Sequence, residues 1–135
     1  VRRIYISVKQ GILDCGNEIL GPNDIRLVRR IVRDYRFRKT DPDATLNMWP
    51  NVMRGERKYI KPFRRDADTT VNSFHDYELC VLKNQALALL HTVPENSLNR
   101  ERADRLADAH DPRVYRRCGV GLHDPLSPWY NKSII

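Results

Sequence analysis

The sequence predicts an all-α protein, one helical domain of several short to medium helices with an extended basic linker and a C-terminal arm. Residues 23–38 separate apolar from basic side chains at helical spacing. Residues 73–91 form a long, mostly apolar run. At 135 residues, the chain has room for one hydrophobic core. We divide this single domain into a basic N-terminal part (1–70), a helical core (71–117) and an extended tail (118–135).

The first predicted helix covers residues 2–20. Gly11 and Gly16 lower its helix propensity, and Gly21 with Pro22 ends it. The prediction depends on apolar side chains that recur at spacings of three and four, namely Ile4, Val8, Ile12, Cys15 and Ile19.

The second predicted helix has an apolar arc and a cationic arc. It begins at Asn23 or Asp24, either of which can cap it. The apolar arc holds Ile25, Val28, Ile31, Val32 and Tyr35, and the opposite arc holds Arg26, Arg29, Arg30, Arg33 and Arg36. Such a helix packs its apolar side on protein and offers its arginines to phosphate, carboxylate or lipid headgroups. We therefore expect Arg26, Arg29, Arg30 and Arg33 to bind a partner.

The segment that follows is irregular. The pairs Trp49-Pro50 and Lys61-Pro62, together with Gly55, interrupt any long element. The sequence therefore predicts a short helix over residues 44–49, and then an extended basic chain that needs an outside surface to lie upon.

The most strongly predicted helix runs over residues 73–91. Ser73 and Asp76 make an acceptable capping pair. Apolar side chains surround most of the helix, a pattern typical of burial on every side. Because a small monomer has little material with which to cover such a helix, we expect Leu82 to contact another subunit.

A polar helix over residues 95–110 and a short turn over residues 111–117 complete the predicted core. Glu101 and Arg105 are spaced for an ion pair on that helix. In the tail, Trp129 is a candidate partner contact, since tryptophan is enriched in protein interfaces.

The composition favours an anionic partner on one surface. The chain has 24 Lys and Arg against 17 Asp and Glu, a net charge of +7, and residues 26–39 and 54–65 hold most of the excess. A solvated basic face without any partner is the alternative. Three cysteines do not make a complete disulfide framework, which favours a reducing compartment. No apolar stretch is long enough for a transmembrane helix, so we expect a peripheral or soluble protein.

The sequence contains no motif typical of catalysis, and we predict no enzyme activity, no cofactor and no metal. It lacks a phosphate-binding glycine loop, a nucleophile elbow and paired-cysteine zinc spacing. His110, Cys118 and His123 fit no common zinc pattern. His75, Asp76 and Glu78 are better interpreted as residues at a helix start than as an acid/base group. Aromatic residues among basic ones could stack on RNA bases or anchor a protein interface, namely Trp49, Tyr59, Phe63 and Trp129.

Four blocks between Phe74 and Trp129 follow the order of a known family. They are Phe74-His75-Asp76-Tyr77-Glu78-Leu79, Ala86-Leu87-Ala88-Leu89-Leu90 with Pro94-Glu95-Asn96, the arginine-rich residues 100–110, and Pro125 to Trp129. This order resembles the small, all-helical, matrix-side accessory subunit of respiratory complex III, ubiquinol–cytochrome c reductase. The family's double arginine is replaced here by Ala88-Leu89, and residues 1–70 have no counterpart.

The resemblance implies a non-catalytic structural and assembly subunit of a mitochondrial inner-membrane respiratory complex. Such a subunit is peripheral, on the matrix side, and binds other subunits of the complex, with anionic lipid as a further contact. A removed transit peptide would agree with a chain that begins at Val1. The alternative is a mitochondrial ribosomal protein that binds rRNA through its arginine-rich face.

Overall fold

The computed structural model describes residues 2–14, 16–75 and 77–110, and this part of the chain is mixed α/β. The all-α prediction is therefore wrong. In chain order the elements are β1 (Ile4–Ser7), β2 (Ile12–Asp14), β3 (Asn17–Leu20), α1 (Pro22–Arg38), α2 (Pro42–Tyr59), the 3-10 helix η1 (Lys61–Asp66), β4 (Thr69–Asn72), α3 (Glu78–Leu90) and α4 (Arg100–Asp108).

Two small sheets occupy the region predicted as the first helix. β1 pairs in parallel with the distant β4, with Ile4 opposite Thr69, and β2 and β3 form an antiparallel hairpin. Ile4, Ile6 and Val8 alternate with other residues, and β-branched side chains at period two favour a strand. Gly16 has a φ of 87°, a left-handed conformation that glycine adopts without strain in a tight turn. The helical spacing read from residues 2–20 was therefore coincidental.

α1 confirms the second predicted helix but corrects its cap, because the helix begins at Pro22 with Gly21 as its N-cap, and Asn23 and Asp24 lie inside its first turn. Pro22 lies in its first turn, and the Asp24 carboxylate accepts the Gly21 amide at 3.2 Å, which closes the N-terminus. The predicted apolar arc is buried except for Tyr35, which is exposed. The helix ends where Lys39 takes a left-handed conformation with φ 55°.

α2 corrects the prediction of a short helix followed by extended chain. It continues for 18 residues with Pro50 inside it. The Asp41 carboxylate caps its start by accepting the Asp43 amide at 2.8 Å. Leu46 and Trp49 are buried in the core, whereas Pro50 is exposed. Packing of the first half of the helix therefore outweighs the local cost of the proline.

α3 and α4 are both shorter than predicted. α3 begins at Glu78, and it is not buried all round, because Val81 is 63% exposed on one side while Leu79 and Leu90 are buried on the other. α4 begins at Arg100. Arg105 forms its ion pair with Asp24 of α1 at 2.7 Å, in place of the predicted pair with Glu101.

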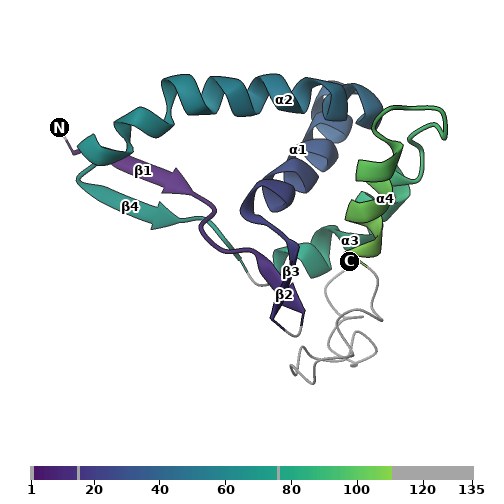
Figure 1. Ribbon diagram of the computed structural model, residues 1–135, viewed down its shortest axis with the longest axis horizontal. Coiled ribbons are helices and arrows are strands. Elements are labelled where there is room, and N and C mark those ends of the chain that lie inside the picture. Colours follow the sequence, from purple (N-terminus) through teal and green to yellow (C-terminus); the bar gives the residue numbers. More distant parts are fainter. Residues whose placement is uncertain (1, 15, 76, 111–135) are drawn as a thin grey trace.

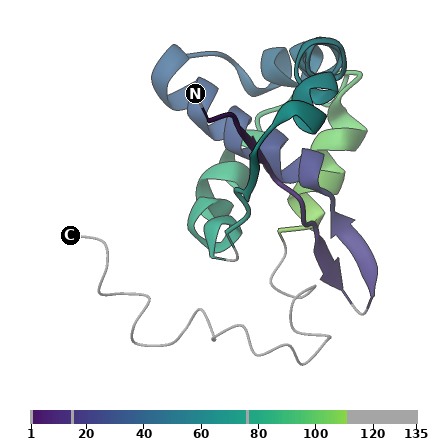
Figure 2. The same cartoon turned by 90° about the vertical axis from the view of Figure 1, so that its left-hand side faces the viewer.

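α1 lies at the centre of the molecule, with α2 passing over it and α3 and α4 on the side away from the β1–β4 pair (Figure 1). The second view looks at the end that carries β1 and β4 (Figure 2). Buried side chains from all four helices form one core, to which Leu20 of β3 and Val8, the residue after β1, also belong. No helix among the described residues is long and apolar enough to cross a membrane. The predicted turn at 111–117 and the predicted tail at 118–135 lie outside the described residues.

Candidate anion-binding cleft

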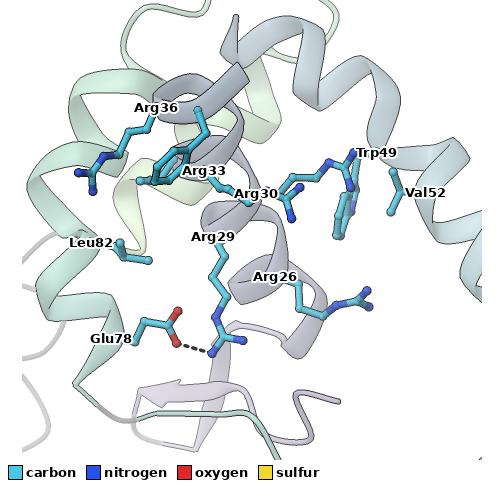
Figure 3. Close-up of a pocket in the computed structure, with 11 residues that line it drawn as sticks. Arg26, Arg29, Arg30, Arg33, Arg36, Trp49, Val52, Glu78 and Leu82 are labelled. Atoms are coloured by element: carbon cyan, nitrogen blue, oxygen red, sulfur yellow. Dashed lines mark hydrogen bonds and ion pairs between the residues drawn. The ribbon is translucent and has the colours of Figure 1, made fainter. Parts of the chain in front are cut away.

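Helices α1, α2 and α3 line an open cleft of about 540 Å³ that is rich in arginines (Figure 3). A volume of this size is typical of small-molecule sites. Its lining consists of Arg26, Arg29, Arg30, Val32, Arg33, Arg36 and Phe37 from α1, Trp49 and Val52 from α2, and Glu78 and Leu82 from α3.

The arginines converge because of their spacing on α1. Residues three or four positions apart share a helix face, and the buried apolar arc of α1 fixes which face is left for the arginines. Trp49 supplies one apolar wall and is only 4% exposed, while Leu82 supplies another and packs against the core. The Arg26 guanidinium lies 5.9 Å from the centre of the Trp49 ring, a cation–π distance.

Two ion pairs fasten α1 to its neighbours along this face. Arg26 pairs with Glu56 of α2, and Arg29 pairs with Glu78 of α3. Arg29 also donates to the backbone carbonyl of Ser73 at 2.7 Å. Arg26 and Arg29 therefore have a structural role as well as a place in the cleft.

Asp34 is a buried carboxylate that forms ion pairs with several arginines of α1. The Arg30 Nε lies 3.2 Å from one Asp34 oxygen, and the Arg33 Nη2 lies 2.9 Å from the other. Arg38, which does not line the cleft, approaches the same carboxylate at 3.5 Å. One carboxylate cannot saturate the donors of three guanidinium groups, each of which has five N–H bonds.

The cleft keeps a surplus of positive charge. Five arginines line it, and their carboxylate partners are Glu56, Glu78 and the shared Asp34. Arg36 forms no ion pair within the described part of the chain, and its guanidinium lies 5.6 Å from the centre of the Phe37 ring. Positive charge without a carboxylate partner thus remains on Arg36, close to Arg33, which shares Asp34 with two other arginines.

The structure brings most of the predicted partner residues together. Arg26, Arg29, Arg30 and Arg33 share the cleft with Leu82, whereas Trp129 lies outside the described residues. The sequence analysis did not predict the three carboxylates that pair with the arginines of the cleft, which are Asp34, Glu56 and Glu78. Only for Asp34 does the sequence carry a signal, since it lies four residues after Arg30 and four before Arg38.

The described residues add no metal ligand or acid/base partner to the other sites considered in the sequence. His110 is buried, while Cys118 and His123 lie outside the described residues, and the described part of the chain contains no cluster of three metal-ligand side chains. His75 stacks against Tyr77 at 5.6 Å, and Glu78 pairs with Arg29. Trp49 is buried and therefore cannot stack on an RNA base, whereas Tyr59 and Phe63 are exposed.

Comparison of the chain with protein-family models, with curated protein sequences and with solved structures finds no match. The chemistry of the cleft therefore carries the functional argument. Geometry and charge make it a concave, cationic cleft whose chemistry suits an anion.

Proposed function

We propose that this protein binds a small phosphate-bearing ligand in the arginine cleft. The observation that supports the proposal is the convergence of five arginines on one concave site whose lining contains one carboxylate, Glu78. Guanidinium groups present paired donors in a plane that matches the oxygens of a phosphate.

The ion pairs indicate where the phosphate would bind. Glu56 and Glu78 neutralise Arg26 and Arg29 and would repel an anion at that end. Arg33 and Arg36 have donors to spare, and Arg33 is half-exposed. The phosphate is therefore expected near Arg33 and Arg36, with the apolar part of the ligand near Leu82 and the Trp49 wall.

A concave site favours a small ligand over duplex RNA. Recognition of an RNA helix uses a surface that spans successive phosphates. In this protein the arginines face into a cleft between three helices, and several already bind carboxylates of the same chain. An RNA partner would have to displace these ion pairs.

Titration calorimetry with inorganic pyrophosphate tests the proposal. Arg36→Gln should weaken binding by about tenfold, the loss of one charge-assisted contact. Arg57→Gln is the matched control, because it removes the same charge from an exposed arginine of α2 that lies outside the cleft lining and forms no ion pair in the described structure. Equal losses in the two variants, or no saturable binding by the wild-type chain at moderate salt, would overturn the proposal.

A second proposal is the role that the resemblance implies, a structural subunit of a mitochondrial inner-membrane complex. It is favoured by two large side chains at the start of α3 that are exposed in the described structure, Tyr77 and Val81. These could pack against another subunit. Co-purification of a tagged chain, compared with a Val81→Asp variant, tests it. Recovery of ribosomal particles instead of membrane subunits would favour the rRNA-binding alternative.

A further inference from the structure

β1 has an edge that no described strand pairs with. The carbonyls of Arg3 and Ser7 accept hydrogen bonds from backbone amides at the start of β4 and directly after it, at 3.3 and 3.0 Å. In a parallel pair, alternate residues bond to the same neighbour. Ile4 and Ile6 therefore direct their backbone N–H and C=O groups to the opposite edge.

An apolar groove lies beside β1. It has a volume of about 380 Å³ and is formed by β1, the end of α2 and η1. Tyr59, Ile60 and Phe63 are exposed there, and so is Ile4 of the strand, while Ile6 is 65% exposed but lies outside the groove lining. Parallel sheets are almost always buried on both faces, so a parallel pair with exposed apolar side chains is incomplete. The groove shares no residue with the arginine cleft.

The surroundings of the groove are cationic. Lys58 and Arg64 lie over the rings of Tyr59 and Tyr5, at 5.0 and 6.0 Å from the ring centres. None of the nearby cations takes part in an ion pair of the described structure, namely Arg2, Arg3, Lys58, Lys61, Arg64 and Arg65. Asp66 is the one carboxylate among the described residues that line the groove, and Asp68, two residues later, already accepts the Arg3 amide at 2.8 Å.

We propose that the free edge of β1 binds an extended segment of a partner polypeptide, with apolar side chains at alternate positions and acidic residues at its ends. The backbone of the segment would pair with Ile4 and Ile6, which adds a strand to the sheet. Its apolar side chains would fill the groove at Phe63, and its acidic ends would meet the cationic rim. A second copy of this chain does not fit, because two cationic rims would repel each other.

Fluorescence anisotropy with a labelled synthetic peptide tests this proposal. The peptide alternates valine and threonine and carries glutamates at both ends. We expect saturable binding to the full chain, and a loss of about tenfold or more when the amides that face β1 are N-methylated, because methylation keeps the side chains and removes the hydrogen bonds. A peptide with lysines at its ends should bind more weakly, and that difference should shrink as salt is added.

Two protein variants locate the site. Phe63→Ser should weaken peptide binding by about tenfold, as loss of a groove anchor does. Leu98→Ser is the matched control, since Leu98 is equally apolar and fully exposed, but lies in the connection between α3 and α4. Unchanged affinity on N-methylation, equal effects of the two variants or absence of saturable binding would each overturn the proposal. Pyrophosphate binding in the arginine cleft is measured separately and does not depend on this result.

Discussion

Asp34 shows how one residue organises the cationic helix. Its carboxylate is 1% exposed and accepts contacts from Arg30, Arg33 and Arg38. A buried carboxylate is tolerated only when it is paired. Asp34 therefore holds neighbouring guanidinium groups in fixed positions, which would lower the entropic cost of binding the proposed phosphate next to them.

Replacement of Asp34 by asparagine should lower the free energy of unfolding by about 1–3 kcal/mol, because the amide keeps the volume but cannot neutralise the arginines. Urea denaturation measures the change. Asp104→Asn is the control, since Asp104 pairs with Arg100 on the surface of α4, where an ion pair contributes less than about 1 kcal/mol. Equal destabilisation by the two variants would show that the buried ion pairs of Asp34 stabilise the fold no more than the surface ion pair of Asp104.

His110 should make stability depend on pH near neutrality. Burial lowers the pKa of its imidazole below the ordinary value of 6.5. The backbone carbonyl of Leu106 accepts a hydrogen bond from Nδ1 at 2.6 Å and raises the pKa in part, whereas the positive charge of Lys83 lowers it. As the pH falls below about 6.5, the unfolded chain takes up a proton that the folded chain does not. The free energy of unfolding should therefore fall from pH 6.5 towards the lower pKa of the folded state.

Urea denaturation at a series of pH values checks this expectation for His110. His110→Gln should flatten the profile between about pH 6.5 and 5, a range above the ordinary titration of Asp and Glu. His75→Gln, which replaces an exposed histidine, should keep the wild-type slope. A slope that survives in His110→Gln would assign the pH dependence to another group.

At the scale of elements, sequence periodicity predicts α1 well and the N-terminal strands poorly. α1 has an apolar arc and a cationic arc, so only one period fits it. Within residues 2–20 the helical period competes with a period of two at Ile4, Ile6 and Val8, and β1 forms there because it pairs with β4, more than 60 residues later in the chain. No local pattern contains that contact. The arginines of the cleft were predicted for the same reason as α1, whereas Glu56 and Glu78 reach it only through tertiary packing.

α2 carries two prolines with opposite expected effects. Pro42 lies in the first turn, where its missing amide costs nothing, whereas Pro50 lies inside the helix. Pro50→Ala should raise the free energy of unfolding by about 1–3 kcal/mol, because Pro50 is exposed and little packing is lost. Pro42→Ala should lower it, since Pro42 is buried. Thermal denaturation of both variants measures these changes in stability. A melting temperature of Pro50→Ala below that of the wild-type chain would contradict the predicted stabilisation.

The described residues form a helical body, the β2–β3 hairpin and the β1–β4 strand pair at one end. The arginine cleft lies within the body, between α1, α2 and α3, and the buried apolar core surrounds α1. The β1–β4 pair lies below the C-terminal end of α2 (Figure 1) and contributes exposed apolar side chains instead of core. The two proposed binding surfaces therefore belong to regions of different expected stability.

Native-state hydrogen exchange should reveal this difference. Amides of α1 are expected to exchange only through global unfolding, because the buried core packs around that helix. Amides of β1 and β4 should exchange faster, through local opening, since a two-stranded pair is marginally stable by itself. Addition of the glutamate-flanked peptide should slow exchange in β1, whereas pyrophosphate should slow exchange in the exposed last turn of α1. Exchange of β1 as slow as that of α1 in the free protein would show that the strand pair is already complete, and would remove the physical reason for strand addition.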